Sequence, residues 1–388
     1  MSQPLNAFII AGEPSGDKLG SSLMAGLKAQ TDITFQGVGG DNMSAEGLHS
    51  LFDMADLSVM GLLEVLPRVP KILRRIRQTV AAAVAAKPDV LITIDSPDFC
   101  LRVAAKLREV MPNLKVVHYV APSVWAWRPE RAAKMARHVD HVLALLPFEP
   151  PYMEEAGMSC DFVGHPLVAE PMPTKADVAE LRTELNLGEA RVIALLPGSR
   201  SGEIKRLLPI YEEVAKRIAA NHPDLKFCVP MAGAVADDLF ERLSMWPVPV
   251  VALDPRGMAV EVSEHRKRTA FHMADAALAT SGTVALELAA ADCPHVVAYR
   301  ANWATTRMVK KMAQIDTANL VNIVTNTRVI PEFLFDACTA DAITPAVTEV
   351  LADPSKQHAA AAETVQALGF GGEDPGARAA KSVLRFLS

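Results

Sequence analysis

The chain has 388 residues, of which 50% are apolar, 22% charged and 5% aromatic, and its formal net charge is −6. This composition is typical of a folded globular protein and excludes disordered, collagen-like and disulfide-rich classes. It also excludes nucleic acid as the main partner, because neither phosphate-neutralising cations nor stacking rings are in excess. At roughly 100–200 residues per domain, the length predicts two domains.

Three expectations concern cysteines, targeting and membranes. The five cysteines are scattered and form neither a C-x-x-C pair nor a cluster with zinc spacing, so we expect reduced thiols. The first residues carry no basic segment followed by a long apolar run, which predicts no secretory signal. No uncharged apolar stretch approaches the roughly 18–20 residues that a membrane-spanning helix needs. We therefore expect a cytoplasmic protein that does not cross a membrane.

Short apolar runs rich in Val, Ile and Leu alternate with helical patterns along two stretches of the chain. The predicted strands are Ala7–Ala11, Val90–Ile94, Val116–Tyr119 and His141–Leu145, then Arg191–Leu196, Lys226–Pro230, Val248–Leu253, Ala276–Ala279 and His295–Ala298. Continuous apolar strands separated by helices are typical of parallel sheets covered on both faces. The sequence therefore predicts an α/β fold with two doubly wound parallel-sheet domains, whose ligands lie in a cleft at the carboxyl ends of the strands.

The predicted domain boundaries follow from stretches rich in proline or glycine, which interrupt helices and strands. The stretch 164–174 contains three prolines and favours neither helix nor strand, so we interpret it as the linker. We expect a first domain at 1–165, a second at 174–352, and a helical C-terminal segment at 353–388. The predicted helices near the C-terminus are Thr344–Leu351, Lys356–Leu368 and Arg378–Leu387, with a Gly-rich breaker at 369–376.

Two motifs follow strands of the first domain. Gly12–Asp17 is a Gly-containing turn before a helix, where backbone N–H groups can bind an anion or a sugar hydroxyl; a purely structural turn is the alternative. Strand Val90–Ile94 ends in Asp95-Ser-Pro-Asp98. A carboxylate at such a strand end can act as a general base, and Asp also caps helices. We interpret Asp95 as the cleft residue and Asp98 as the cap.

A third motif, His118–Arg128, holds two of the four tryptophans. Trp and His beyond a strand end can bind a ring or position a polar ligand, and the alternative is that these rings pack beneath a loop.

The second domain contains two turns suited to phosphate. Pro197–Glu203 combines backbone donors with the guanidinium of Arg200, which suits a diphosphate. Ser281–Thr283 opens a helix whose N–H groups can meet phosphate, and Glu287, one turn later, can accept hydrogen bonds from ribose hydroxyls. The alternative for this triplet is an ordinary helix cap.

The segment Val59–Val80 is basic and amphipathic. Its apolar residues at helical spacing are Val69, Ile72, Leu73, Ile76 and Val80. Its basic residues are Arg68, Lys71, Arg74, Arg75 and Arg77. This pattern indicates a surface for anionic lipid or an acidic ligand, and a core-packed helix with a solvated basic face is the alternative.

Taken together, these residues resemble the lipid-A-disaccharide synthases, bacterial glycosyltransferases of GT-B architecture with two Rossmann-like domains. The resemblance covers essentially the whole chain. It rests on Gly12–Asp17, Val59–Val65, Ile94–Phe99, His118–Arg128, Leu145–Glu149, Leu195–Arg200 and Ser281–Glu287. The loop Pro255–Thr269 departs from the family by being more charged and longer, near where such folds hold the uracil ring.

The resemblance implies a reaction of lipid A and lipopolysaccharide biosynthesis. A 2,3-diacylglucosamine moves from its UDP donor to the 6-hydroxyl of 2,3-diacylglucosamine 1-phosphate, giving a β(1→6) disaccharide 1-phosphate and UDP. The α-linked donor and β-linked product require inversion at the anomeric carbon. Direct inversion needs a base for the acceptor hydroxyl and positive groups for the departing phosphate, and it needs no protein nucleophile.

Residue roles follow from the same resemblance. Asp95 is expected to be the general base, and Arg200 the group that stabilises the leaving diphosphate. The expected donor contacts are Gly198, Ser199, Arg200, Ser281, Gly282, Thr283, Glu287 and Asn322. The expected acceptor-side residues are Glu13, Ser15, Asp17, His118 and Trp125. We expect no obligatory metal or other cofactor, because helix N-termini and a guanidinium can replace a divalent ion.

The lipid substrates implied by the resemblance suggest that the basic amphipathic segment binds a membrane. We expect peripheral association with the inner face of the cytoplasmic membrane. The expected membrane or acyl contacts are Val59, Met60, Leu62, Leu63, Ile72, Arg74 and Arg75. The resemblance also implies a homodimer, with the C-terminal helices packing on an N-terminal domain of their own or of a partner subunit.

Three alternatives remain at this point. One is an isomerase of the UDP-N-acetylglucosamine 2-epimerase kind, which shares the architecture but needs no second sugar. Another is a different UDP-sugar-dependent lipid glycosyltransferase, such as that of peptidoglycan synthesis. The third is a nucleotide-sugar or lipid-binding protein without a catalytic step, which would not need both Asp95 and Arg200.

Overall fold

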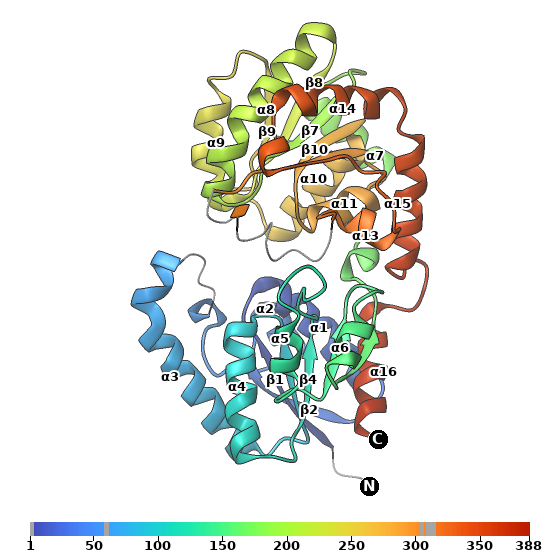
Figure 1. Ribbon diagram of the computed structural model, residues 1–388. Coiled ribbons are helices and arrows are strands. Elements are labelled where there is room, and N and C mark those ends of the chain that lie inside the picture. Colours follow the sequence, from blue (N-terminus) through green and yellow to red (C-terminus); the bar gives the residue numbers. More distant parts are fainter. Residues whose placement is uncertain (1–3, 58–61, 303–305, 308–315) are drawn as a thin grey trace. The chain divides into compact units, whose positions relative to one another are not determined.

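The computed structural model describes residues 4–57, 62–302, 306–307 and 316–388, with the backbone alone for 62–68. The chain forms two compact units (Figure 1). Unit 1 comprises Met1–Ala169 and Leu368–Ser388, and unit 2 comprises Glu170–Ala367. Each unit contains a six-stranded parallel sheet. Among the described residues, no helix combines the length and apolar character that crossing a bilayer requires.

Unit 1 orders its strands β2-β1-β3-β4-β5-β6. The strands are β1 (Leu5–Ala11), β2 (Ile33–Val38), β3 (Val90–Ile94), β4 (Lys115–Tyr119), β5 (His141–Ala144) and β6 (Ser159–Phe162). The helices are α1 (Pro14–Lys28), α2 (Asp41–Ala45), α3 (Leu62–Ala86), α4 (Pro97–Val110), α5 (Glu130–Met135), α6 (Pro150–Glu155) and α16 (Pro375–Leu387), with short 3₁₀ turns at Met54–Asp56 and Pro166–Ala169.

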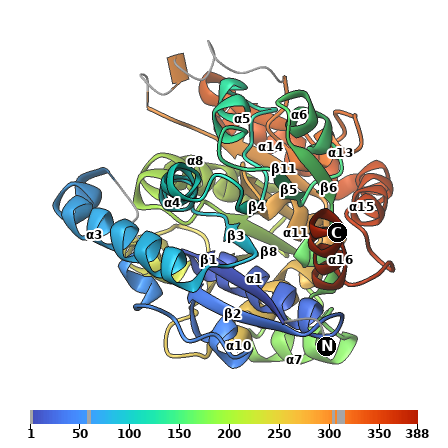
Figure 2. The ribbon, with the colours of Figure 1, turned by 90° about the horizontal axis from the view of Figure 1, so that it is seen from below.

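Helices cover both faces of the unit 1 sheet (Figure 2). Successive strand residues point to opposite faces, so Phe8 and Ile10 pack with α3, α4, α5 and α6. Ala7 and Ile9 instead pack with α1, α2 and α16. Because both faces are buried, β1 and β3 need apolar residues at nearly every position, which explains the continuous apolar runs in the sequence.

Unit 2 orders its strands β12-β11-β10-β7-β8-β9. The strands are β7 (Val192–Leu196), β8 (Lys226–Pro230), β9 (Val250–Leu253), β10 (Ala276–Thr280), β11 (His295–Tyr299) and β12 (Glu332–Leu334). The helices are α7 (Lys175–Glu184), α8 (Ser201–Asn221), α9 (Ala236–Leu243), α10 (Val260–Met273), α11 (Val284–Ala290), α13 (Leu320–Val324), α14 (Ala340–Ala352) and α15 (Ser355–Ala367), with 3₁₀ turns at Gly233–Val235 and Phe335–Ala337.

The sheet of unit 2 is also buried on both faces. Ile193 and Leu195 of β7 pack with α8, α9 and α14. Ala194 and Leu196 of the same strand pack on the other face, with α10 and α11. Helices therefore cover both faces of the central strands β7 and β10. These two strands pair with each other, so their carboxyl ends lie side by side at fixed positions.

All nine predicted strands are present, and the predicted α/β fold class is confirmed. The prediction missed β2, β6 and β12, each of which lies at the edge of its sheet. Edge strands are only partly buried, so polar residues such as Gln36 in β2 and Asp161 in β6 interrupt their apolar runs. The missed strands thus lack the continuous apolar signal of central strands.

The C-terminal segment divides between the two units. Helix α16 packs against α1 in unit 1, whereas α15 packs against α11 and α13 in unit 2. The expectation that all of 353–388 packs on an N-terminal domain is therefore wrong for α15, because Ala360 and Ala361 belong to the core beneath β11. Helices α1 and α16 approach closely at two glycines. A Cβ atom added to Gly26 would lie 2.7 Å from the carbonyl oxygen of Gly376.

The chain passes between the units twice, after Ala169 and after Ala367. The first passage lies inside the predicted linker 164–174 and follows the 3₁₀ turn Pro166–Ala169. The two passages are close together, because the backbone N–H of His165 donates to the carbonyl oxygen of Leu368 at 3.1 Å. Unit 2 is thus a continuous chain segment inserted into unit 1.

Candidate functional site

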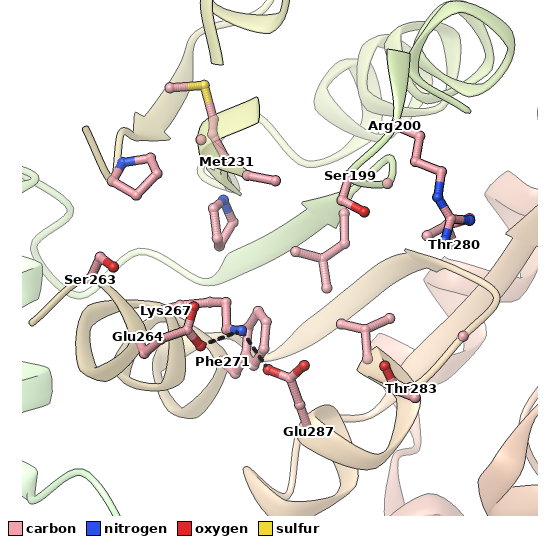
Figure 3. A pocket seen from close by; sticks show the side chains of 18 of the residues that line it. Ser199, Arg200, Met231, Ser263, Glu264, Lys267, Phe271, Thr280, Thr283 and Glu287 are labelled. Atoms are coloured by element: carbon pink, nitrogen blue, oxygen red, sulfur yellow. Dashed lines mark ion pairs between the residues drawn. The ribbon is translucent and has the colours of Figure 1, made fainter. Parts of the chain in front are cut away.

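A pocket of about 760 Å³ opens at the carboxyl ends of β7, β8 and β10 in unit 2 (Figure 3). Three chain segments supply most of its lining. These are the turn after β7, the turn after β10, and the segment from Pro255 to Lys267. The predicted donor contacts Gly198, Ser199, Arg200, Ser281, Gly282, Thr283 and Glu287 all line this one pocket.

The turn after β7 is shaped by a glycine and a glutamate. Gly198 has φ +112°, and a Cβ atom there would lie 2.4 Å from Oε2 of Glu203, so the turn requires glycine. Glu203 in the first turn of α8 accepts from the Ser199 N–H at 3.2 Å and lies 3.2 Å from the Arg200 guanidinium. The Arg200 side chain is nevertheless 74% exposed. Glu203 therefore fixes the loop while Arg200 stays accessible to a ligand.

The turn after β10 presents small polar residues at the start of α11. Ser281 donates its hydroxyl to the carbonyl oxygen of Ala318 at 3.3 Å, and Thr283 is the N-cap residue of α11. The hydroxyl of Thr280, at the end of β10, is buried and has no hydrogen-bond partner among the described residues. Thr280 also lines the pocket, so its buried oxygen is a polar group that a ligand can satisfy.

Glu287 projects from the first turn of α11 and is held by a lysine. Lys267 Nζ lies 2.8 Å from Oε2 of Glu287 and 2.7 Å from Oε2 of Glu264 (Figure 3). Burial by itself lowers the pKa of Lys267, but the two carboxylates outweigh it, so the pKa lies above its ordinary value. Lys267 is therefore a firmly charged ammonium inside the pocket.

The pocket includes residues to which sequence reasoning gave no role. Met231 follows β8, Phe271 belongs to α10, and Arg256 pairs with Asp254 and Asp237. The signal that could have found some of them is the loop Pro255–Thr269, which the sequence marked as unusually charged. The structure shows that this segment forms one wall of the pocket, but only its first residues are a loop, because α10 begins at Val260.

Asn322 does not line this pocket, contrary to the prediction. It is fully buried, its side-chain amide donates to the carbonyl oxygen of Ile330 at 2.9 Å, and its amide oxygen accepts from the Ile330 N–H at 2.9 Å. With both ends of the amide used by one backbone residue, Asn322 holds the chain before β12 in place.

In unit 1, Asp95 directly follows the central strand β3. Its N–H donates to the carbonyl oxygen of Tyr119 at 2.9 Å, which continues the sheet ladder to the strand end. Asp95 and Ser96 have φ values of +49° and +42°, a left-handed conformation that is uncommon outside glycine. Ser96 is the N-cap of α4, so the expectation that Asp98 caps this helix is wrong, and Asp98 lies in the first turn.

Glu13, at the carboxyl end of β1, is the neighbour of Asp95. Burial raises the pKa of Glu13, the negative charge of Asp95 raises it further, and a hydrogen bond with the Ser96 side chain opposes both. Ser15 is exposed in the first turn of α1. The carboxyl ends of β1 and β3 therefore bring two partly buried carboxyl groups together beside an exposed serine.

Asp17 does not offer its carboxylate to an acceptor, contrary to the prediction. It is buried, and its two oxygens accept from the N–H groups of Gly40, Asn42 and Met43 at 2.7, 2.9 and 3.1 Å. The Asn42 side chain donates a further bond at 2.8 Å. Asp17 thus ties α1 to the start of α2, where backbone N–H groups need an acceptor.

His118 and Trp125 also have structural partners. His118 is buried, its Nδ1 lies 2.8 Å from the Thr93 hydroxyl, and burial lowers its pKa to about 4. Trp125 is buried against Phe148 in an edge-to-face contact, and its indole N–H donates to Glu149 at 3.4 Å. The alternative interpretation of these rings, packing beneath a loop, describes Trp125, and His118 is held inside the sheet by Thr93.

The basic amphipathic segment is α3 over most of its length. Val59 and Met60 lie outside the described residues, and of Leu62 and Leu63 only the backbone is described. Ile72 is partly buried against the core of unit 1, and its membrane contact stays a prediction.

Arg75 differs from the prediction. It forms an ion pair with Asp56 at 2.5 Å and lies over the Phe52 ring, so its guanidinium is already engaged. Arg74 is exposed, as are Val69 and Leu73, which are each 38% exposed. The face of α3 that meets solvent therefore combines apolar and basic side chains.

Among the described residues, no group of three or more His, Cys, Asp or Glu side chains could hold a metal ion. All five cysteines are free and buried. The expectation that no metal is needed stays a prediction.

Comparison with known proteins identifies the family. The family model described as "Lipid-A-disaccharide synthetase" matches residues 7–382. A lipid-A-disaccharide synthase from Ruegeria pomeroyi is 55% identical over 381 residues, covering 98% of this chain and 95% of that protein. One from Rhodospirillum centenum is 43% identical, covering 100% and 96%.

Solved structures show the fold. A UDP-GlcNAc 2-epimerase from Neisseria meningitidis bound to UDP-GlcNAc has a TM-score of 0.63 and 13% identity, covering 99% of this chain and 98% of that one. A structure described as the glycotransferase of kitacinnamycin has a TM-score of 0.63 and 16% identity, covering both chains completely. These likenesses support the predicted GT-B architecture, but at such identities they do not distinguish an epimerase from a transferase. The family match does, and the chain belongs to the lipid-A-disaccharide synthase family of UDP-dependent glycosyltransferases.

Proposed function

We propose that the unit 2 pocket binds the UDP part of UDP-2,3-diacylglucosamine. The observation that carries this proposal is that the turns after β7 and β10 line one pocket together with Glu287. Backbone N–H groups and the exposed Arg200 suit a diphosphate, and a carboxylate suits the ribose hydroxyls. A pocket of about 760 Å³ is within the usual size range for a small-molecule site.

We further propose that Asp95 is the general base. In this reaction Asp95 takes the proton of the acceptor 6-hydroxyl, and the hydroxyl oxygen forms a bond to the anomeric carbon of the donor. The bond between that carbon and the diphosphate oxygen breaks, and UDP leaves with the electron pair. Arg200 and the N–H groups of the two turns stabilise the negative charge that develops on the leaving group, so the chemistry proceeds without a divalent ion.

The reaction is tested by incubating the protein with UDP-2,3-diacylglucosamine, with and without 2,3-diacylglucosamine 1-phosphate, in the presence of EDTA. We expect UDP release only when both sugars are present, with formation of a β(1→6) disaccharide 1-phosphate. Conversion of UDP-N-acetylglucosamine in the absence of a second sugar would support an epimerase instead. Activity that requires an added divalent ion would contradict the metal-free mechanism.

We also propose that the enzyme works in the cytoplasm, bound peripherally to the inner face of the cytoplasmic membrane. Both substrates carry acyl chains, which favour a bilayer over water. Support comes from α3, where Val69 and Leu73 lie one turn apart and are exposed beside the exposed Arg74 and Arg77. Apolar and basic side chains on one exposed helix suit a surface of anionic lipid.

Vesicle flotation tests the membrane proposal. The variant Val69→Ser, Leu73→Ser is expected to bind anionic vesicles several-fold more weakly than the parent protein, and the parent's binding should fall with salt. A matched control is Val110→Ser, because Val110 at the end of α4 is an exposed valine of the same unit. Equal binding by the double variant and the parent would remove α3 from the membrane contact.

A homodimer is the last part of the proposal. The family resemblance supports it, and sedimentation equilibrium tests it. We expect twice the mass of one chain at micromolar concentration, and a chain that stays monomeric under those conditions would contradict the proposal.

A further inference from the structure

Lys267 is a charged residue in the pocket to which the proposed reaction gives no role. It belongs to α10, and its ammonium contacts Glu264, one turn earlier on the same helix, and Glu287 on α11. Figure 3 shows Lys267 reaching between these two carboxylates. All three side chains line the pocket. The ion pair between Lys267 and Glu287 therefore joins two helices inside the proposed donor site.

Glu287 has one oxygen held and one available. The ion pair with Lys267 uses Oε2, and among the described residues no hydrogen bond or ion pair is recorded for Oε1. The Lys267 side chain is 29% exposed and that of Glu287 is 27% exposed. The carboxylate is thus anchored on one side and remains open to the pocket on the other. Such an anchor reduces the freedom that Glu287 would lose on binding a ligand.

The charges explain why an anchor is needed. A carboxylate near a diphosphate is repelled by it, and here two carboxylates, Glu264 and Glu287, line the same pocket as the phosphate-suited turns. Lys267 neutralises one of these two charges. Its ammonium also contacts Oε2 of Glu287. This contact opposes rotation of the Glu287 side chain away from the negatively charged nucleotide.

We propose that Lys267 is a positioning residue that acts through Glu287 and thereby makes the donor site selective for a ribose with free 2′ and 3′ hydroxyls. This inference rests on the proposed function, because it assumes that UDP occupies the pocket. Oε1 of Glu287 accepts from the ribose hydroxyls, Oε2 stays on Lys267, and Glu264 keeps the ammonium in place. Lys267 has no direct contact with the diphosphate in this arrangement.

A ligand comparison tests the inference. Binding of UDP and of 2′,3′-dideoxy-UDP is measured by calorimetry on the full chain and on Lys267→Met. We expect the parent protein to prefer UDP by about tenfold or more, since two hydrogen bonds to a charged group are lost with the dideoxy compound. In Lys267→Met the affinity for UDP should fall about 10- to 100-fold. The ratio of the affinities for UDP and for 2′,3′-dideoxy-UDP should fall towards one.

The opposing model is a direct contact between Lys267 and the diphosphate. It predicts that both ligands weaken equally in Lys267→Met and that the preference for UDP is unchanged, which would overturn the proposal. Lys267→Arg keeps the charge and is expected to recover most of the preference. Lys267→Gln gives the same comparison if the methionine variant does not fold. Lys216→Met, at an exposed lysine of α8, is the control for the loss of one positive charge.

Coupling to Glu287 gives a second readout. If Lys267 acts through Glu287, the double variant Lys267→Met, Glu287→Gln binds UDP no more weakly than Glu287→Gln, within about twofold. Independent, additive losses would contradict the inference. A parent protein that does not bind UDP would instead reject the proposed donor site itself, so the two failures are distinguishable.

Discussion

The two units have the same kind of sheet but use the carboxyl ends of their strands differently. In unit 2 the polar residues after β7 and β10 line an open pocket, and Arg200 is mostly exposed. In unit 1 half of the predicted site residues are buried with partners of their own, as Asp17 and His118 are. A motif of polar residues after a strand is therefore evidence of a ligand site only when its hydrogen bonds are not already used.

Because of this difference, only a few side chains of unit 1 are available to take part in the proposed reaction. Once Asp17, His118 and Trp125 are assigned to the scaffold, Glu13 and Ser15 remain from the predicted acceptor side, next to the predicted base Asp95. Asp95 and Glu13 are only partly buried and adjoin each other. The comparison predicts that substitutions in unit 1 separate into those that affect turnover and those that affect stability, whereas substitutions in the unit 2 pocket affect affinity.

The largest effect is expected for Asp95→Asn. Removing a general base lowers kcat by about 10²- to 10⁴-fold, while UDP affinity should stay within about twofold because the proposed UDP site lies in unit 2. Steady-state kinetics and calorimetry measure the two quantities. Asp98→Asn is the matched control, since Asp98 lies exposed in the first turn of α4. Near-normal turnover of Asp95→Asn would reject the assignment.

Asp17→Ala should affect stability. The substitution leaves three backbone N–H groups without their acceptor, so the free energy of unfolding is expected to fall by about 2–4 kcal/mol. Urea unfolding measures it, with Asp41→Ala at an exposed position of α2 as control. Unchanged stability together with lost activity would return Asp17 to the acceptor site.

Arg200→Ala should show the opposite behaviour. The dissociation constant for UDP is expected to rise about 10- to 100-fold, because a charge-assisted contact to the diphosphate is lost. The stability should hardly change, since the side chain is mostly exposed. Lys216→Ala is a control on the same unit. A loss of stability without a loss of affinity would place Arg200 among the scaffold residues.

A pH dependence of the stability is expected from Glu149. Burial raises the pKa of this carboxyl to about 7, although the Leu146 N–H and the Trp125 indole stabilise its charged form. The folded state therefore binds a proton more readily than the unfolded state between about pH 4.5 and 7. The free energy of unfolding should fall as pH rises through this range, by at most about 1.4 kcal/mol per pH unit.

Glu149→Gln is expected to remove this contribution to the slope. Urea unfolding of both proteins between pH 5 and 8 checks it, with Glu154→Gln, at an exposed position of α6, as control. Parallel pH profiles for the parent and Glu149→Gln would show that the buried carboxyl does not titrate as the structure indicates.

The central strands and the two phosphate-suited turns of the unit 2 pocket could be predicted from sequence because their signals are local. Burial on both faces requires apolar runs, as in Val90–Ile94, and the phosphate-suited turns are short segments after strands. The edge strand Glu332–Leu334 has only three residues, so it leaves no run to detect.

The structural roles of single polar residues could not be predicted, because their partners are distant in the sequence. Asp17 contacts the backbone of Gly40, and His141 contacts Ser382, 241 positions away. The same limit applied to Lys267, whose partner Glu287 lies on another helix. Only the folded chain shows which polar side chains remain available.

The insertion of unit 2 within unit 1 has a consequence for biosynthesis. Ala379, Ala380 and Val383 of α16 complete the core around α1, yet they leave the ribosome only after the whole of unit 2. The core of unit 1 can therefore be completed only after the whole of 170–367 has emerged. A nonsense mutation shortly after Ala367 would leave the chain of unit 2 intact and would expose the apolar face of α1 in unit 1, which would then be open to proteolysis.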